Sequence, residues 1–355
     1  MDSNERFCLV KGIAQEIITE EELKVLLDSN LHPLAYDGFE PSGLAHLPLG
    51  IYRPLLLKEL LKAGFKFNLL LADSFAWINE KAGGELENAR VLGEYYLEVW
   101  KAAGLDTSKI NVKWHSDFLA DKDYVKLVLQ VARKHSEKRT KRCLAIAGRS
   151  EDAQLTAAQL FYPSMQVADI FYQGIDVTQL GLDQRKANML AREVAPLIGR
   201  KPPVVVSHRM LLGLDGASSA SASDEVSHKM SKSKPASSIF VHDSSSEIKK
   251  KISKAYCPEK IIDGNPVLEY AREIIFRAKN ELVVERPEKF GGSVSFDSYL
   301  ELEKAFSKGE LHPMDLKNAV AISLDELIAP IRKHFEDNAK AKKLFDSAKT
   351  IQVTR

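Results

Sequence analysis

Cysteine is scarce in this sequence. Its 355 residues include only Cys8, Cys143 and Cys257, which lie far apart. This spacing excludes a disulfide-stabilised scaffold and favours a reducing compartment. No Cys/His cluster has the spacing of a zinc site, so we predict no protein-bound metal centre.

Long apolar runs are also lacking. No run approaches the roughly 20 residues that a membrane-spanning helix needs. The N-terminal segment MDSNERFCLVKG is too polar for a secretory signal. These observations predict a cytoplasmic protein without a membrane partner.

The chain has no excess charge of either sign. It has 50 Lys+Arg against 49 Asp+Glu, a formal net charge of +1. This balance excludes a globally basic nucleic-acid-binding protein, although local basic patches remain open. The hydrophobic fraction of 45% and charged fraction of 28% are those of a globular protein. They exclude global disorder and collagen-like repeats, and the length suggests roughly two domains.

Apolar runs alternate with amphipathic segments in the first two thirds of the chain. The run FNLLLA is typical of a strand covered on both faces. Thr19 and Glu22 form a capping-box pattern in the first amphipathic segment. Strands are expected at residues 34–39, 67–72, 110–114, 175–180 and 204–207, and helices at residues 15–29, 85–103, 121–147 and 154–173. This alternation predicts an α/β fold with a parallel sheet and crossover helices.

The pattern changes after residue 216. Residues 217–228 (ASSASASDEVSH) are small and polar, which is typical of a flexible loop. From about residue 247 the pattern is mostly helical, with helices over 315–348 and Pro330 as a kink or break. We therefore expect an α/β domain, a flexible loop and a smaller helical domain.

Residues 229–233 (KMSKS) carry the sharpest chemical signal. Lys229 and Lys232 flank small hydroxyl residues directly after the loop. Ammonium groups can neutralise charge on a phosphate leaving group, and hydroxyls can hold its oxygens. A solvated Lys/Ser loop is the alternative, and the position after a parallel-sheet pattern favours the phosphate role.

A second motif, YDGFEPSG with HLPLG, follows the first expected strand. The carboxyl end of a strand in an open parallel sheet is where such folds bind ligands. Glycines allow the backbone to approach a nucleotide closely, and a helix N-terminus favours phosphate. Pro48 and Pro54 predict either a helix start near Arg53 or a kink.

Together these segments resemble class I aminoacyl-tRNA synthetases, most closely tyrosyl-tRNA synthetases of the archaeal and eukaryotic type. The resemblance spans about residues 10–340 and is carried by YDGFEPSG, TAAQLFYPSMQVADIFY, QLGLDQRKANMLARE, KMSKSKP, KISKAYCPEK, RPEKFGG and LHPMDLKNAV. It implies a Rossmann-like catalytic domain with a dimer and acceptor-stem insertion (residues 1–215). A KMSKS loop and linker (216–246) and a mostly helical anticodon-binding domain (247–355) follow.

The resemblance implies a tyrosine site. Asp169 and Tyr36 match residues that contact the substrate's phenolic hydroxyl, and Tyr162, Gln166 and Gln184 match residues that hold its ammonium group. On a helix, residues 162, 166 and 169 share one face. Phenylalanine lacks the hydroxyl and would leave a buried aspartate unpaired, so no editing domain is expected.

The resemblance also implies an ATP site. His46, Gly50, Lys229 and Lys232 match catalytic positions, and further ATP contacts fall at Gly38, Glu40, Ser42, Gly181, Asp183, Met230, Ser231 and Ser233. Asp73, after the second strand, matches a residue at the pocket edge. The chain departs from the usual H-I-G-H signature, because HLPLG has one extra residue and no second histidine.

RNA-binding positions are predicted in three places. Phe290, His312 and Asp315 match anticodon-reading positions, where a ring can stack on a base and a carboxylate can accept from guanine. A core phenylalanine and a helix-capping aspartate are the alternatives. Basic clusters at residues 133–142 and 249–254 fit either phosphate tracking or solvated faces.

The implied reaction is the two-step attachment of tyrosine to tRNA(Tyr). ATP is a substrate, Mg²⁺ is implied by triphosphate chemistry, and a homodimer is implied by the family. A tryptophanyl-tRNA synthetase and a synthetase-like RNA-binding protein that has lost catalysis are the two alternatives. The lack of a second histidine is the best support for the latter.

Overall fold

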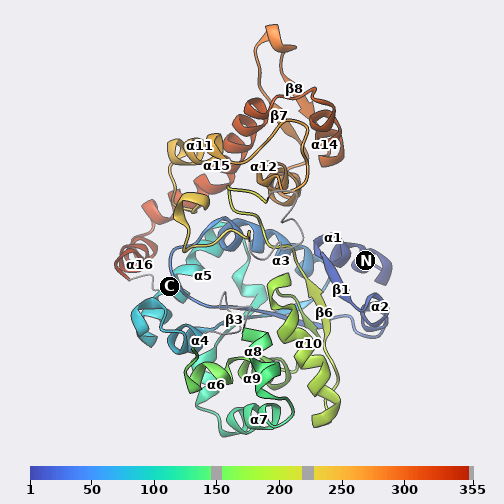
Figure 1. The fold of residues 1–355 in the computed structure, drawn as a ribbon, viewed down its shortest axis with the longest axis vertical. Helices are drawn as coiled ribbons and strands as arrows, with labels where there is room; N and C mark the ends of the chain where they lie inside the picture. The colour runs from blue at the N-terminus through green and yellow to red at the C-terminus, as the bar shows by residue number, and fades with distance from the viewer. Residues whose placement is uncertain (145–153, 218–227, 352–355) are drawn as a thin grey trace.

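The chain is built around a six-stranded, mostly parallel sheet (Figure 1). The computed structural model describes residues 1–144, 154–217 and 228–351. The strands, in the spatial order β1-β6-β5-β2-β3-β4, are β1 (Glu16–Ile18), β6 (Val204–Ser207), β5 (Val177–Thr178), β2 (Leu34–Phe39), β3 (Lys66–Leu71) and β4 (Ile110–Trp114). Only the pairing of β1 with β6 is antiparallel.

The strand order creates a crevice beside β2. From β2 the chain runs outward through β3 to β4, and later occupies β5 and β6 on the other side. In the register, Tyr36 of β2 lies between Asn68 of β3 and Thr178 of β5. Open α/β sheets bind ligands where the strand order reverses, at the carboxyl ends of the strands. The crevice between β2 and β5 is such a point.

Helices cover the sheet and extend it at one end. They are α1 (Ser3–Ile13), α2 (Glu20–Ser29), α3 (Arg53–Lys62), α4 (Asp73–Ile78), α5 (Leu86–Ala102), α6 (His115–Leu119), α7 (Lys122–Ala132), α8 (Glu137–Leu144), α9 (Ala157–Tyr172) and α10 (Arg185–Val194). In Figure 1, α6 to α9 form the lower end of the molecule. Among the described residues, no helix is both long and apolar enough to span a bilayer.

The C-terminal segment forms the opposite end of the molecule (Figure 1). It contains α11 (Ser245–Lys254), α12 (Pro266–Tyr270), α13 (Phe276–Ala278), α14 (Tyr299–Lys308), α15 (Pro313–Asp337), α16 (Ala339–Thr350) and the hairpin of β7 (Leu282–Val284) and β8 (Val294–Phe296). The last helix, α16, returns to pack on α5. One apolar cluster, from Phe7 to Ala348, therefore includes residues of the sheet and of the C-terminal segment.

Several expected elements are confirmed. The strands at 34–39, 110–114 and 204–207 have the expected bounds, and the Thr19 capping box is present. Gly104 ends α5 with a positive φ of 75°, a conformation that glycine adopts at low cost. The α/β class with a smaller helical C-terminal part is confirmed.

Other expectations were wrong in detail. The helix expected over 15–29 begins only at Glu20, because residues 16–18 pair with β6 as a strand. The helix expected over 121–147 is two helices, α7 and α8. The strand expected at 175–180 is limited to β5, and α1 and the hairpin β7–β8 were not predicted. Partners distant in sequence decide such edge strands.

Pro330 does not break its helix. Helix α15 runs through it to Asp337, and the next helix starts at Ala339 with Asn338 as its cap. Ile328 and Ile331 are fully buried on either side of the proline. Tertiary packing therefore compensates for the missing N–H donor.

Candidate active site

A cavity of about 770 Å³ opens at the crevice between β2 and β5. It is lined by all but one of the residues predicted for the tyrosine and ATP sites. These are Tyr36, Gly38, Glu40, Ser42, His46, Tyr162, Gln166, Asp169, Gly181, Asp183, Gln184, Lys229, Met230, Ser231, Lys232 and Ser233. The exception is Gly50, and the predicted pocket-edge residue Asp73 does not line the cavity either. Segments spread over nearly 200 positions thus converge because the parallel strands end at one edge of the sheet.

Asp169 forms the deep end of the cavity. Helix α9 begins with a capping box at Thr156 and buries Asp169 on its sheet-facing side. The side chain's Oδ1 accepts a hydrogen bond from the Tyr124 hydroxyl at 2.8 Å and lies 3.1 Å from Nε2 of His115. Tyr36 lies close by. Burial raises the pKa of its phenol well above the usual value, and the nearby charge of Asp169 raises it further. Such a site suits a substrate hydroxyl.

Sequence reasoning missed His115 and Tyr124. His115 directly follows strand β4, and polar residues at the carboxyl end of a parallel strand are a signal of site residues. Tyr124 lies on the apolar face of α7, where its hydroxyl gave no sequence signal.

The predicted ammonium-binding side chains surround the middle of the cavity. Gln166 donates to the side-chain oxygen of Gln184 at 3.0 Å, and the Tyr162 hydroxyl donates to Glu40 at 3.4 Å. Glu40 also pairs with Lys81 at 2.9 Å. Acceptor oxygens from α9, from the 3₁₀ turn Leu182–Gln184 and from the residue after β2 thus line a common space, which suits a cationic group.

The nucleotide end carries Gly181 and Asp183. A side chain at Gly181 would place its Cβ 2.5 Å from Sδ of Met210 and 2.6 Å from Oδ1 of Asp183, so any larger residue would displace these two side chains. The Asp183 carboxylate pairs with Nζ of Lys229 at 2.6 Å. Lys229 in turn forms an antiparallel bridge with Leu212, which anchors the start of the KMSKS segment.

Lys232 reaches the other side of the cavity. Its Nζ donates to the hydroxyl of Tyr96 at 2.5 Å. Burial lowers the pKa of Lys232 to about 7, Lys81 adds to this effect, and Glu40 opposes it. Two lysines of one short segment therefore line the cavity, Lys229 paired with Asp183 and Lys232 with Tyr96. Both can turn to a phosphate.

His46 is held neutral. Burial lowers its pKa well below the usual value, and the charges of Lys232 and Lys229 lower it further. Its Nδ1 is buried without a hydrogen-bond partner among the described residues. A neutral ring with an uncommitted nitrogen beside two lysines is suited to contact a phosphate oxygen.

The HLPLG departure has a structural explanation. Residues Pro48–Tyr52 form a wide π-helical turn, and the α-helix begins at Arg53. The extra residue is accommodated in this turn, and both prolines fall in the first positions of their helical segments, where no N–H is needed. The helix start expected near Arg53 is confirmed.

Gly50 lies away from the cavity lining. A Cβ at this position would lie 2.3 Å from Cγ1 of Val241 and 3.3 Å from Cγ1 of Val99. The glycine thus permits close packing of the π-helical turn against α5 and the segment after KMSKS. Asp73 is likewise structural, since it accepts from the backbone and hydroxyl of Ser116 at 2.9 and 2.6 Å.

A buried ion pair at the cavity wall was not predicted. Asp37 and Arg53 are 4% and 5% exposed, and their charged groups are 2.8 Å apart. Arg53 also donates to the side chain of Gln179 at 2.5 Å. Burial raises the pKa of Asp37 to about 7 against the opposing charge of Arg53. The pair joins β2, the start of α3 and the end of β5.

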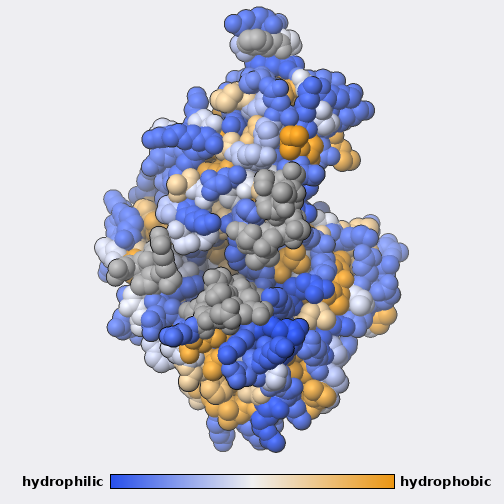
Figure 2. All heavy atoms as spheres, in the orientation of Figure 1, coloured by the Kyte–Doolittle hydropathy of each residue, from blue (hydrophilic) through white to orange (hydrophobic). Residues whose placement is uncertain are grey.

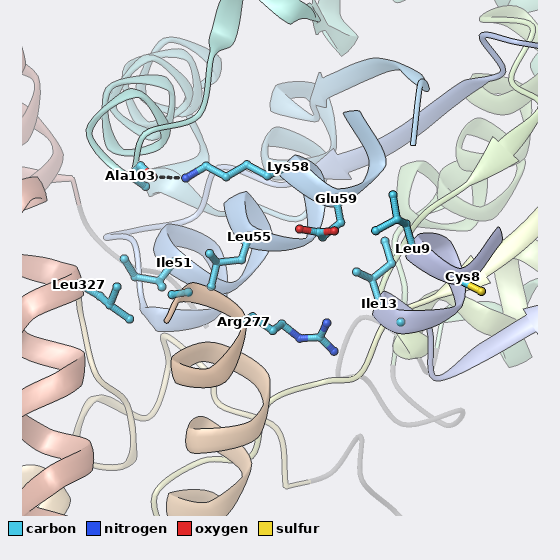
Figure 3. Close-up of a pocket in the computed structure, with 12 residues that line it drawn as sticks. Cys8, Leu9, Ile13, Ile51, Leu55, Lys58, Glu59, Ala103, Arg277 and Leu327 are labelled. Carbon is cyan, nitrogen blue, oxygen red and sulfur yellow. Dashed lines mark hydrogen bonds between the residues drawn. The ribbon is translucent and has the colours of Figure 1, made fainter. Parts of the chain in front are cut away.

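A second cavity, of about 510 Å³, lies between α1, α3 and the C-terminal segment (Figure 3). Its walls include Leu9, Ile13 and Leu55, and Lys58 extends to the carbonyl oxygen of Ala103 at 3.0 Å. None of the predicted motifs contributes to it. The chemistry is therefore concentrated in the cavity at the sheet.

The predicted anticodon segments lie together. Arg286 donates to the carbonyl oxygens of Gly292 at 2.7 Å and Glu310 at 3.0 Å, and so connects the two segments. His312, not Asp315, is the capping residue of α15, because its Nδ1 accepts from the backbone of Met314. The capping alternative for Asp315 is therefore wrong. Phe290 ends a short 3₁₀ turn, and its side chain lies outside the described part of the structure.

The basic clusters are partly neutralised. Arg139 pairs with Glu193 at 2.9 Å, and Lys251 pairs with Asp243 at 2.6 Å. Exposed members are Arg133, Lys134, Lys138, Arg142, Lys249, Lys250 and Lys254. The loop predicted at 217–228 falls, apart from its two ends, outside the described residues.

Comparison with known proteins decides the family. The family described as tRNA synthetases class I (W and Y) matches residues 29–329. A protein of Arabidopsis thaliana named tyrosine–tRNA ligase 1, cytoplasmic, is 44% identical over 99% of this chain and 89% of its own length. The tyrosine–tRNA ligase of Aeropyrum pernix is 45% identical over 94% of this chain and 93% of its own. The chain belongs to the tyrosyl-tRNA synthetases of the archaeal and eukaryotic type.

Solved structures agree with this family. The tyrosyl-tRNA synthetase of Aeropyrum pernix superposes with a TM-score of 0.87 at 40% identity, over 98% of this chain and 99% of that one. The Archaeoglobus fulgidus enzyme, solved with L-tyrosine, gives 0.86 at 39% identity, over 94% and 99%. A tryptophanyl-tRNA synthetase from Aeropyrum pernix gives 0.69 at 20% identity, over 95% and 85%. That last likeness concerns the fold alone.

Proposed function

We propose that this tyrosyl-tRNA synthetase activates tyrosine with ATP and transfers it to the 3′ end of tRNA(Tyr). One observation carries the proposal. Asp169 and Tyr36, suited to a phenol, share a single cavity with His46, Lys229 and Lys232, suited to phosphates. The relatives named tyrosine–tRNA ligases support the same reaction.

The first step needs no protein nucleophile. The carboxylate oxygen of tyrosine attacks the α-phosphorus of ATP, and the bond to the pyrophosphate oxygen breaks. Lys229 and Lys232 stabilise the charge that develops on the departing pyrophosphate, and neutral His46 donates to a phosphate oxygen. In the second step, a ribose hydroxyl of the tRNA's terminal adenosine attacks the tyrosyl carbonyl and releases AMP.

Within the ATP site, we assign the ribose to Gly181 and Asp183. The Gly181 backbone allows close approach, and Asp183 can exchange its contact with Lys229 for ribose hydroxyls. Gly38, Glu40 and Ser42 at the end of β2 would line the ATP phosphates together with Met230, Ser231 and Ser233. We do not assign Gly50 a contact with substrate.

A protein-held magnesium ion does not fit the described residues. They contain no group of three His, Cys, Asp or Glu side chains placed to hold a metal. The cavity carboxylates Asp37, Glu40 and Asp183 each already have a cationic partner. Mg²⁺ would therefore arrive with the triphosphate, and no step above is assigned to it.

We also propose that residues 247–355 form an anticodon-binding module. Arg286 connects Gly292, just after the turn that ends at Phe290, to Glu310, just before His312, and this link supports a shared RNA contact. The catalytic unit would then be residues 1–215, with residues 216–246 as the KMSKS loop and linker.

A homodimer is a further part of the proposal. Large apolar side chains are exposed on neighbouring helices, with Val125 at 41% and Leu129 at 50% on α7, and Phe161 at 42% on α9. Figure 2 shows hydrophobic residues on the lower end of the molecule, where Figure 1 places these helices. Sedimentation of wild type and Leu129→Glu tests this: a dimer that Leu129→Glu dissociates supports the contact. A wild-type monomer would contradict it.

We propose a cytoplasmic location, which the Arabidopsis relative's name supports.

Amino-acid-dependent ATP–pyrophosphate exchange tests the function. Tyrosine is expected to drive exchange, and tryptophan and phenylalanine are not. Exchange with tryptophan alone would favour the tryptophanyl alternative, and no exchange with any amino acid would favour a lapsed enzyme. Asp169→Ala is expected to lower the preference for tyrosine over phenylalanine about 10- to 100-fold, since the buried acceptor is lost.

A further inference from the structure

Three buried polar atoms form a triangle beneath the cavity. The Tyr124 hydroxyl is 2.7 Å from Nε2 of His115 and 2.8 Å from Oδ1 of Asp169, and Nε2 is 3.1 Å from the same Oδ1. The three residues are at most 1% exposed. Water therefore cannot replace a missing hydrogen bond here. The carbonyl oxygen of Met165 is a further acceptor at 3.3 Å from the Tyr124 hydroxyl, but the contact with Oδ1 of Asp169 is shorter, at 2.8 Å.

The triangle selects one tautomer of His115. With hydrogen on Nε2, both Tyr124 and His115 donate to the Asp169 carboxylate. With hydrogen on Nδ1, Nε2 would take the Tyr124 proton and leave Oδ1 facing two lone pairs. We assign the Nε2–H tautomer from this hydrogen-bond geometry.

This tautomer has a structural cost. It leaves Nδ1 of His115 as a buried acceptor without a partner among the described residues. The ring is enclosed by Phe75, whose centroid is 4.4 Å away, and Phe118, at 5.8 Å. An apolar ring of similar size would avoid this unsatisfied atom, so stability alone does not explain a histidine here.

The contacts give the two carboxylate oxygens of Asp169 different roles. Both protein donors are directed to Oδ1, so Oδ2 is the oxygen available to a phenol in the cavity. Tyr124 and His115 thus both use this side chain as an acceptor. An acceptor in a fixed orientation is what separates tyrosine from phenylalanine.

We propose that His115 is a positioning residue that sets the preference for tyrosine. It acts through Nε2–H by fixing the orientation of Asp169 and keeping the carboxylate an acceptor. This inference rests on the proposed function, because it concerns the substrate of the same site.

Variants of His115 separate positioning from packing. His115→Gln carries an amide N–H near the position of Nε2. His115→Asn places an amide N–H near Nδ1, and His115→Leu has none. ATP–pyrophosphate exchange with tyrosine and with phenylalanine gives the preference as a ratio of kcat/KM values. His115→Asn and His115→Leu are expected to lower this ratio about 10- to 100-fold with the KM for ATP unchanged. His115→Gln is expected to keep most of the wild-type ratio.

Two further variants complete the experiment. Tyr124→Phe removes the other donor, keeps the ring, and is expected to lower the ratio by a similar factor. His135→Gln is the matched control, since His135 contacts Ser164 of the same helix α9 at 2.9 Å rather than Asp169. It should leave the ratio unchanged.

The outcomes are distinct. An unchanged ratio in His115→Leu and Tyr124→Phe would overturn the inference and leave the proposed function intact. Equal losses of kcat/KM for tyrosine and phenylalanine in His115→Leu and His115→Gln, with a raised KM for ATP, would also overturn it. Such losses would show that His115 acts through packing alone. Absence of tyrosine-dependent exchange in the wild type would overturn the proposed function itself, and this inference with it.

Discussion

The ammonium of Lys232 lies 2.5 Å from the phenolic oxygen of Tyr96. The same oxygen accepts from the backbone of Ser42 at 3.2 Å and donates to the carbonyl of Gly43 at 2.8 Å. Tyr96 is fully buried on α5. One hydroxyl therefore connects the KMSKS segment to the loop that follows β2, the two segments predicted to bind ATP.

Tyr96→Phe is expected to slow adenylate formation about 10-fold and leave the KM for tyrosine unchanged. The substitution removes only the oxygen, so Lys232 and the backbone of Ser42 lose a shared partner. Pre-steady-state adenylate formation measures the effect. Tyr95→Phe is the matched control, because its hydroxyl accepts from the backbone of Ala45 at 3.2 Å and does not contact Lys232. Equal slowing in both variants would contradict the special role of Tyr96.

The pKa of Lys232 predicts a pH dependence. Burial lowers this pKa to about 7, so in the free enzyme the side chain is an ammonium below pH 7 and an amine above it. Because kcat/KM reports groups of the free enzyme, kcat/KM for ATP is expected to fall as pH rises through about 7. Lys232→Arg stays charged and should flatten the profile. A wild-type profile that is flat from pH 6 to 9 would refute this.

Gly50→Ala is expected to destabilise the fold by about 1–3 kcal/mol through overpacking. The new methyl would lie 2.3 Å from Cγ1 of Val241. Val241→Ala removes that methyl group. Gly50→Ala is therefore expected to lower the free energy of unfolding much less in the Val241→Ala background than in the wild type. Urea unfolding of the four proteins measures the coupling. Full stability of the single variant, together with lost exchange activity, would instead favour the catalytic role predicted from the sequence.

Asp315→Ala is expected to lower tRNA charging at least 10-fold and leave ATP–pyrophosphate exchange unchanged. Asp315 is in the first turn of α15, far along the chain from every cavity residue, and it does not cap the helix. Loss of a carboxylate that accepts from a guanine would act on RNA alone. Glu336→Ala, on the last turn of the same helix, is the control. Normal charging of a wild-type transcript by Asp315→Ala would exclude the predicted contact.

Local signals account for much of the fold. The apolar run of β2 and the capping box at Thr19 are readable because neighbours in sequence produce them. The strand β1 and the continuity of α15 through Pro330 depend on partners distant in sequence; β1 was predicted as part of a helix, and the break considered at Pro330 does not occur. Local preference is weak compared with burial against such partners.

The sequence by itself determined which motifs the cavity would contain, since spacing on α9 and the order of the strands bring Asp169, Tyr36 and the KMSKS lysines to one edge of a parallel sheet. Only the tertiary structure decided how these groups are held. The hydroxyls of Tyr96 and Tyr124 come from helical faces that look merely apolar in the sequence, and His115 stands alone after its strand. Their roles arise from hydrogen bonds at 2.5 to 3.1 Å between segments far apart in the chain. Such distances follow from packing, which no local pattern specifies.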